Sequence, residues 1–261
     1  MKNLKLFSFL FSILLVSCSK DDVAPNPGTN PSDGKKLSRI SYGDGSYQAI
    51  EYNTEGKVSK VTNHNVYAGG TDHIVSAFIY NGTQLSEIKG DDASKFVYTY
   101  TNNLVSKVEI YVTGMLVGYY SYTYLDGRLS RADGYFGFST IPANPATRYE
   151  NEYYTSGNLK KISLYSRGAN NTLDKVNEYV LNDYDNNQNT TVLFESNPFL
   201  PLTGYMPNNP LSQIKYDHNG TVEETVTYTY TYDAAGRPLT RKMVTKATGA
   251  RDVIDNASFT Y

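Results

Sequence analysis

The chain has 261 residues, a formal net charge of −2 at pH 7 and one cysteine. Its near-neutral charge and the lack of a basic cluster argue against nucleic acid as a partner, and a single cysteine excludes an intramolecular disulfide. Tyrosine dominates the aromatic residues, with 25 copies against 10 phenylalanines and no tryptophan, which favours aromatic surfaces that stay partly wet.

Residues 1–17 have the pattern of a secretory signal peptide. Lys2 and Lys5 precede an apolar run over residues 6–16, which is too short to span a membrane as a helix. The run ends in the letters LVSC, and this ending resembles the lipobox of bacterial lipoproteins. The resemblance implies cleavage before Cys18 and a diacylglycerol on its thiol. The alternative is an ordinary secretory signal in which the cysteine is incidental.

Residues 18–36 are predicted to form a disordered tether, because they hold proline, glycine and polar residues and almost nothing apolar. The letters SKDD that begin at Ser19 resemble the surface-export signal of Bacteroidetes lipoproteins; the alternative is a plain solvated linker. The resemblance implies a protein held by lipid in the outer membrane and exposed on the cell surface. In this interpretation the protein contacts the membrane only through its N-terminal lipid anchor.

Residues 37–261 are predicted to form a single all-β domain built from a degenerate repeat. In each copy an aromatic-rich strand ends at tyrosine, a polar turn follows, and the chain resumes at leucine or valine. Copies lie at 50–61, 78–88, 98–108, 122–132, 152–162, 213–224 and 230–241. Alternating tyrosine and threonine places the tyrosines on one strand face, and glycine in the turn supplies a positive φ. Each copy is therefore a β-hairpin.

The restarts share a second pattern, as in LSRI, VSKV and LSEI, with apolar residues at i and i+3. In a straight strand these two positions point to opposite faces. Either both faces are partly covered, or a β-bulge brings the two residues to the same face. Both alternatives suit a large twisted antiparallel sheet of stacked hairpins that curls into an open or partly closed barrel.

The copy YTYDAAGRPLTR at 230–241 resembles the YD repeat of Rhs-type proteins. Only the copies at 126–128 and 235–237 carry the Gly-Arg pair, most copies lack the aspartate after tyrosine, and the chain is far shorter than the Rhs shells that enclose a toxin. The chain also resembles Bacteroidetes surface lipoproteins of unknown function. Both resemblances imply an antiparallel sheet of stacked hairpins, and neither implies an activity.

Asp183, Asp185 and Asn187 alternate along the chain and resemble the opening of a calcium loop. The glycine and glutamate that such a loop carries at its sixth and twelfth positions are replaced by Gln188 and Phe194. The alternative is a turn of one more degenerate repeat. The three histidines, His64, His73 and His218, are also not spaced like the ligands of a metal site. We therefore expect no metal and no cofactor.

The sequence contains no catalytic motif, so we predict that the protein is not an enzyme. The carboxylate pairs Glu150 with Glu152 and Glu223 with Glu224 are interpreted as solvated strand residues rather than as a glycosidase pair.

Five aromatic residues are candidates for contact with a ligand. Tyr228, Tyr230 and Tyr232 form one stripe of a strand, and packing in the sheet is the alternative role for them. Phe199 and Tyr205 lie in the proline-rich segment 194–211, which interrupts the repeat. That segment is expected to cover a sheet edge or barrel mouth, or else to form an apolar lip on a pocket.

These observations leave four hypotheses for function. The first is a surface-anchored module that binds a glycan, a peptide or another envelope protein. The second is a structural envelope protein without a small ligand. The third is a carbohydrate-active hydrolase, which a cleft with convergent carboxylates would reveal, and the fourth is a lipid carrier, which an open apolar concave face would reveal.

Overall fold

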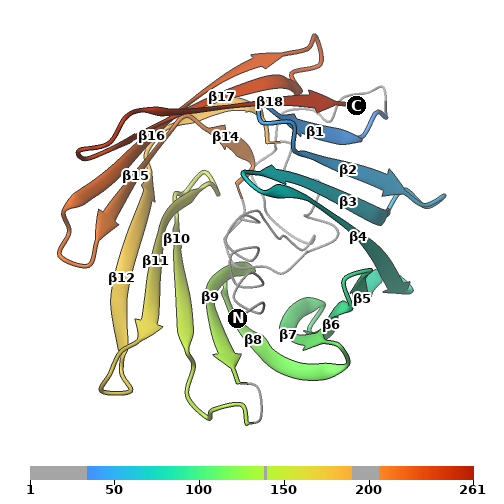
Figure 1. Cartoon of the computed structure of the whole chain (residues 1–261), viewed down its shortest axis with the longest axis vertical. Coiled ribbons are helices and arrows are strands. Elements are labelled where there is room, and N and C mark those ends of the chain that lie inside the picture. Colours follow the sequence, from blue (N-terminus) through green and yellow to red (C-terminus); the bar gives the residue numbers. More distant parts are fainter. Residues whose placement is uncertain (1–33, 138–139, 190–205) are drawn as a thin grey trace.

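The computed structural model describes residues 34–137, 140–189 and 206–261. In these residues all regular structure is β, and sixteen strands form one closed antiparallel barrel (Figure 1). The barrel strands are β1 (Arg39–Tyr42), β2 (Tyr47–Tyr52), β3 (Val58–Tyr67), β4 (Gly70–Asn81), β5 (Gln84–Gly90), β6 (Ser94–Thr101), β7 (Leu104–Val112), β8 (Met115–Leu125), β9 (Arg128–Phe136), β10 (Thr147–Tyr153), β11 (Leu159–Arg167), β12 (Leu173–Leu181), β15 (Ser212–Asp217), β16 (Val222–Tyr232), β17 (Pro238–Ala247) and β18 (Val253–Thr260). A two-stranded ribbon, β13 (Tyr184–Gln188) with β14 (Asn208–Pro210), interrupts the series.

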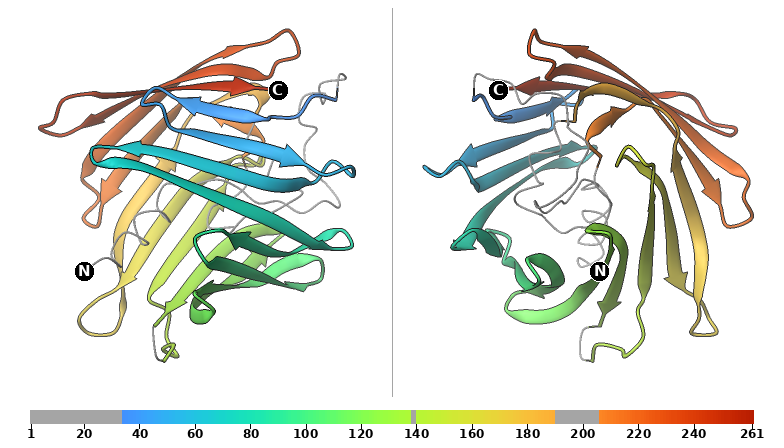
Figure 2. Two further views of the ribbon diagram at one scale, coloured as in Figure 1. Left: turned by 45° about the vertical axis from the view of Figure 1, so that its right-hand side comes forward. Right: turned by 180° about the vertical axis from the view of Figure 1, so that it is seen from behind.

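The first and last strands close the barrel. β1 pairs with β18, with Ile40 opposite Phe259, and pairs on its other edge with β2. The predicted all-β sheet of hairpins is therefore confirmed, and closure is complete rather than partial; Figure 2 shows the strands running obliquely around the ring. In the described residues no helix is long and apolar enough to cross a membrane.

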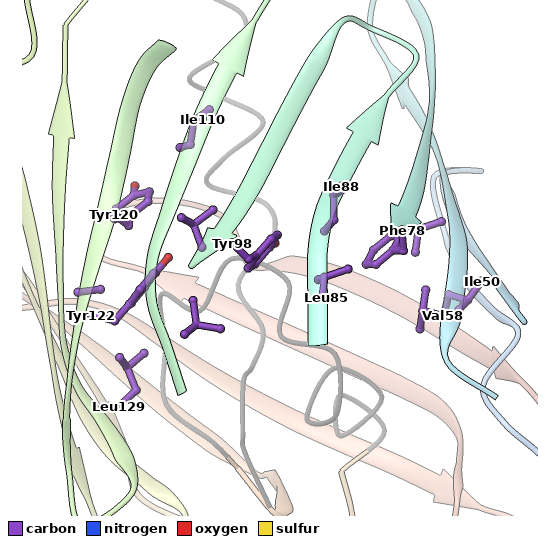
Figure 3. Close-up of a cluster of buried hydrophobic side chains, with 14 of the residues drawn as sticks. Ile50, Val58, Phe78, Leu85, Ile88, Tyr98, Ile110, Tyr120, Tyr122 and Leu129 are labelled. Carbon is purple, nitrogen blue, oxygen red and sulfur yellow. The ribbon is translucent and has the colours of Figure 1, made fainter. Parts of the chain in front are cut away.

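The barrel has a buried inner face and an exposed outer face. Since a single closed sheet can cover only its inside, the strand positions with buried apolar side chains face inward. Along β16 the tyrosines are half-buried while Thr227, Thr229 and Thr231 are exposed, which confirms the predicted alternation. The inner side chains of strands β2 to β9 form a largely apolar cluster, shown in Figure 3: Ile50, Val58, Phe78, Leu85, Ile88, Tyr98, Ile110, Tyr120, Tyr122 and Leu129.

The restart pattern of the repeat is a β-bulge. Across β6 and β7, Tyr98 lies opposite Val108 and Tyr100 lies opposite Val105, so Ser106 is an extra residue. The bulge turns both valines inward, and both are buried. The Ser106 hydroxyl donates a 3.2 Å hydrogen bond to the carbonyl oxygen of Thr99 across the bulge. Of the two predicted alternatives, the bulge is the one that occurs.

Six tyrosines join neighbouring copies of the repeat. The hydroxyl of each donates a hydrogen bond to the backbone carbonyl oxygen of a leucine or valine at which an earlier copy resumes. The pairs are Tyr52 with Leu37 (2.7 Å), Tyr80 with Val58 (2.8 Å), Tyr100 with Leu85 (2.9 Å), Tyr124 with Val105 (2.9 Å), Tyr153 with Leu129 (2.8 Å) and Tyr184 with Leu159. We call this series the tyrosine ladder.

The aspartate of the YD motif builds the turn. One carboxylate oxygen of Asp233 accepts hydrogen bonds from the backbone N–H groups of Ala235 (2.8 Å) and Arg237 (2.9 Å), and the other is ion-paired with the Arg237 guanidinium at 2.6 Å. Gly236 takes a φ of 77° and donates its N–H to the Asp233 carbonyl oxygen. Asn53 and Asp217 act in the same way in their own turns. Each accepts hydrogen bonds from the backbone N–H groups two and four residues further along the chain.

One copy of the repeat is out of phase with the others. The turn at residues 217–221 joins β15 to β16 at the opposite end of the barrel from the turn at 233–237, since β16 runs between them. Tyr216 consequently pairs with Glu178 and Val222 and makes no ladder contact. The copy at 213–224 is a hairpin as predicted, but it does not extend the tyrosine ladder.

The ribbon of β13 and β14 lies within one end of the barrel (Figure 1). Asn208 on β14 is hydrogen-bonded at 3.1 Å to Asn158, a buried residue of the β10–β11 turn. Met206 packs with Leu159 and Leu181 in a second small apolar cluster. The described part of the segment 194–211 therefore covers a barrel mouth, as one of its two sequence interpretations proposed.

Candidate functional site

The inner face changes character at strands β16, β17, β18 and β1. One row of side chains crosses these strands: Tyr230 lies opposite Arg241, Arg241 opposite Ala257, and Ala257 opposite Tyr42. Tyr228 lies two residues before Tyr230 on the same face. Because Ala257 is small, it leaves Arg241 and Tyr42 free to extend over it. We call Tyr42, Tyr228, Tyr230 and Arg241 the inner arginine site.

Arg241 forms no ion pair or hydrogen bond in the described part of the chain, and its Nε atom is buried without a partner. An unpaired buried donor costs about 1–3 kcal/mol, more when the group is charged. The nearest acid on the same face is Asp255, which lies opposite Met243 one inward position further along β17. This arginine therefore differs from Arg237, whose guanidinium is paired with Asp233 at 2.6 Å.

The three tyrosines of this site differ from those of the ladder. The hydroxyl groups of Tyr42, Tyr228 and Tyr230 have no hydrogen-bond partner among the described residues, whereas each ladder tyrosine donates to a backbone carbonyl. Tyr228 and Tyr230 stack with ring centroids 6.5 Å apart. All three are half-buried, so solvent still reaches them. Ligand sites carry a few polar groups that orient the bound molecule, and hydroxyls without a partner beside an unpaired guanidinium are groups of this kind.

The tyrosine pKa values reflect this surrounding. Burial raises the pKa of Tyr42 and of Tyr228 above 10, and the positive charge of Arg241 acts in the opposite direction on both. Burial also raises the pKa of Tyr230. The three phenols are thus neutral hydrogen-bond donors at physiological pH, and Arg241 carries the positive charge of the site.

Of the predicted ligand-contacting residues, the structure brings Tyr228 and Tyr230 to this site. Tyr232 extends the stack, 6.0 Å from Tyr230, but its hydroxyl is hydrogen-bonded to Asp185. Tyr232 is therefore engaged in holding the β13–β14 ribbon. Phe199 and Tyr205 lie outside the described residues, as do Cys18 and the predicted signal peptide. Sequence reasoning missed Tyr42 and Arg241, because only strand register places them in one row.

The three residues of the calcium hypothesis do not converge. Asp185 accepts hydrogen bonds from the N–H of Asn187 (3.0 Å), from the N–H and side chain of Asn209, and from Tyr232. Asp183 instead accepts from the Ser212 hydroxyl at 3.1 Å. A calcium ion at Asp185 would have to displace these donors. In the described residues no group of three or more acidic, histidine or cysteine side chains is arranged to hold a metal.

The carboxylate pairs occupy separate places. Glu150 and Glu152 lie on the outer face, where Arg148 and Lys161 form ion pairs with them at 3.7 and 2.5 Å. On β16, Glu223 forms an ion pair with Lys215 at 2.9 Å. These contacts agree with their interpretation as strand residues in ion pairs, while the absence of enzymatic activity remains a prediction.

A depression of about 400 Å³ lies across β1, β17 and β18. Its lining includes Tyr42, Arg241 and Ala257, together with the alternating residues Ser41, Thr240, Lys242, Asn256 and Ser258. The depression therefore borders two residues of the inner arginine site, Tyr42 and Arg241.

Comparisons with known proteins support the fold. A porin-like protein from Bacteroides uniformis is 14% identical, with a TM-score of 0.60, over 86% of this chain and 97% of that chain. A porin-like protein from Bacteroides vulgatus is 12% identical, with a TM-score of 0.41, over 87% of this chain and 99% of that one. The TcdB2-TccC3-Cdc42 complex is 11% identical, with a TM-score of 0.29, over 80% of this chain and 14% of that one.

No family model matches the chain, and no curated protein matches it. The first similarity shows that this barrel architecture occurs in a Bacteroides protein. The other two have TM-scores too low to carry an argument. The antiparallel sheet of hairpins that the Rhs-type resemblance implied is present in the structure, while the Rhs-type and lipoprotein assignments stay predictions.

Proposed function

We propose that this protein is a lipid-anchored envelope protein whose barrel binds a carboxylate-bearing ligand at the inner arginine site. The observation that carries the proposal is Arg241, a half-buried guanidinium that no acid of the described chain pairs. A carboxylate forms two parallel hydrogen bonds with a guanidinium and removes the cost of leaving it unpaired. The free hydroxyls of Tyr42, Tyr228 and Tyr230 then hydrogen-bond the rest of the ligand.

The outer face supports a tethered barrel rather than one embedded in lipid. Ion pairs between strands and within strands lie on it: Lys60 with Glu51 (2.5 Å), Arg148 with Asp133 (2.7 Å) and Lys161 with Glu152 (2.5 Å) join neighbouring strands, and Lys89 with Glu87 (2.9 Å) and Lys107 with Glu109 (2.7 Å) lie along one strand. Membrane-embedded barrels present an apolar band instead, and each lysine or arginine there costs about 2–4 kcal/mol at mid-membrane. In this proposal the membrane is contacted only through the lipid on Cys18, and the barrel stands at the cell surface.

The ligand has two chemical sources that the site does not separate, an acidic glycan and an acidic peptide. Sugar faces stack on tyrosine rings, and peptide backbones accept hydrogen bonds from tyrosine hydroxyls. Both supply the carboxylate that Arg241 requires. The test therefore uses one probe of each kind, together with its neutral counterpart.

The experiment measures the melting temperature and the binding heat of the full mature chain with oligogalacturonate, with a short aspartate- and glutamate-rich peptide, and with their neutral analogues. We expect one acidic probe to bind and its neutral analogue to bind at least tenfold more weakly. Arg241→Gln is expected to lower the affinity about 10- to 100-fold, since hydrogen bonds to charged groups are worth about 1.5–3 kcal/mol. Lys242→Gln is the matched control, because the adjacent side chain lies on the outer face.

If neither acidic probe binds, or if both variants bind as the wild type does, the inner arginine site is not a carboxylate site. The second candidate, a structural envelope protein without a small ligand, would then stand. The tyrosine ladder favours this candidate, because its hydrogen bonds join neighbouring hairpins and so give most copies of the repeat a structural role. A melting temperature that no probe changes is its expected signature.

A further inference from the structure

Two of the three histidines face each other on the outer surface. His64 on β3 lies directly opposite His73 on β4, in a hairpin whose strands pair continuously from Lys60 to Gly70. Their ring centroids are 6.1 Å apart, with an angle of 60° between the ring planes. The inward residues of β3 are Val58 and Val61, which the bulge brings to one face, so His64 points outward.

The nitrogens of these two rings are available. In the described part of the chain, neither imidazole makes a hydrogen bond or an ion pair. Tyr47 on β2 lies opposite His64 and stacks on it with centroids 5.0 Å apart, and Arg39 stacks on the other side of Tyr47 at 3.7 Å. Stacking on Tyr47 holds the plane of the His64 ring. The His73 ring is exposed to solvent.

We propose that His64 and His73 form a two-imidazole site for a divalent transition metal of the zinc, copper or nickel type. With metal–nitrogen bonds of about 2.0–2.1 Å, two coordinating rings have their centroids roughly 5–6.5 Å apart, depending on the angle at the metal. The observed 6.1 Å lies within that range. Binding requires one nitrogen of each ring to turn toward a common ion, and the exposed His73 ring is the one that has room to do so.

The chemistry of the site selects the metal. Imidazole nitrogen suits zinc, copper and nickel, whereas magnesium and calcium require oxygen ligands. No group of three or more histidine, cysteine, aspartate or glutamate side chains is arranged to hold a metal among the residues that the structure describes, so in this proposal water completes the coordination. The positive charge of Arg39 lies beyond the Tyr47 ring, where solvent screens its repulsion. This site is independent of the inner arginine site, which lies on the opposite face of the sheet.

The test uses the full mature chain without a histidine tag and adds copper(II) chloride or zinc chloride alone. We expect one equivalent of copper to bind, with an electron paramagnetic resonance spectrum that shows coupling to two imidazole nitrogens. Two linked ligands bind about 100-fold more tightly than one. His64→Gln and His73→Gln are therefore each expected to lower copper affinity about 100-fold and to leave one-nitrogen coupling or none.

His218→Gln is the matched control, because this third histidine lies in the turn between β15 and β16, away from the pair. It is expected to bind copper as the wild type does. The proposal is overturned if His218→Gln weakens binding as much as either other variant, or if the wild type and the His64→Gln, His73→Gln double variant bind equally. Urea unfolding of each variant verifies that both strands are intact, since both side chains lie outside the core. Magnesium and calcium chloride are expected to leave the melting temperature unchanged.

Discussion

The phenol hydroxyl of Tyr100 donates a 2.9 Å hydrogen bond to the backbone carbonyl oxygen of Leu85, a residue of the preceding hairpin. The bulge beside Leu85 interrupts the regular backbone hydrogen bonds between β4 and β5. A phenylalanine at position 100 would fill the same space and leave this carbonyl without its donor. The preference for tyrosine at the end of each copy thus follows from hydrogen bonding between hairpins.

Tyr100→Phe is expected to lower the free energy of unfolding by about 1 kcal/mol, because it removes one hydrogen bond and leaves a half-buried carbonyl oxygen unsatisfied. Urea denaturation monitored by circular dichroism measures the change. Tyr119→Phe is the control, since Tyr119 lies on the outer face, stacked on Tyr135 at 4.6 Å. Equal stability of the two variants would show that the ladder does not stabilise the barrel.

Ile88→Ala is expected to destabilise the protein by about 2–5 kcal/mol, because it opens a cavity in the inner apolar cluster. Ile88 is 0% exposed, whereas Ile79, one strand away, is 38% exposed. Ile79→Ala is therefore expected to cost less than half as much. The midpoints of urea unfolding for the two variants test this, and a reversed order would contradict the assignment of inner and outer faces.

Asp233→Asn tests the turn that the YD motif builds. Burial acts to raise the pKa of Asp233, but hydrogen bonds from the backbone N–H and guanidinium of Arg237 and from the N–H of Ala235 outweigh it and lower this pKa below its ordinary value. A lowered pKa in the folded state stabilises the protein above about pH 4, the value in the unfolded chain, and the effect is lost as pH falls through the folded-state pKa.

The wild type is accordingly expected to be more stable than Asp233→Asn at pH 7, by less than about 1 kcal/mol because solvent screens the pair. The difference should shrink between pH 4 and pH 2. Urea midpoints at pH 7, 5, 4 and 3 measure it, and Asp252→Asn, a substitution in the exposed turn before β18, serves as the control. A difference in stability between the two proteins that stays constant with pH would show that the charge of the Asp233 carboxylate does not cause it.

Cys18→Ser tests the predicted lipid anchor. We expect the wild type to incorporate radiolabelled palmitate and to sediment with membranes, and the variant to do neither, since the thiol is the atom that carries the diacylglycerol in bacterial lipoproteins. Protease treatment of intact cells measures surface exposure at the same time. Palmitate incorporation by the Cys18→Ser variant would contradict the prediction.

Local features of this fold were predictable from sequence, and features that depend on register were not. The tyrosine, turn and restart of each copy act within about a dozen residues, so the hairpins follow from them, and the bulge at Ser106 was one of the two alternatives that they left open. Closure depends on the summed twist and stagger of all strands, which no single copy encodes. The row from Tyr230 through Arg241 and Ala257 to Tyr42 spans four strands and needs the register of each pair.

The histidine pair is an intermediate case. His64 and His73 were interpreted as unrelated, because their spacing matches no metal motif. Yet Tyr67 pairs with Gly70 around the two-residue loop of Ala68 and Gly69, and counting outward from that loop places His64 opposite His73. The glycines at 69 and 70 were therefore the available signal for this hairpin.

Because β1 hydrogen-bonds to β18, the number of repeats is a property of the whole ring. An open stack of hairpins accepts a duplicated unit at its end without disturbing the others. In a closed ring, strand number, tilt and diameter are linked, so one additional hairpin changes the dimensions of the whole ring and moves Tyr230, Arg241 and Tyr42 relative to whatever they hold. Duplication of a unit here therefore alters every strand, whereas changes in loops and single side chains stay local.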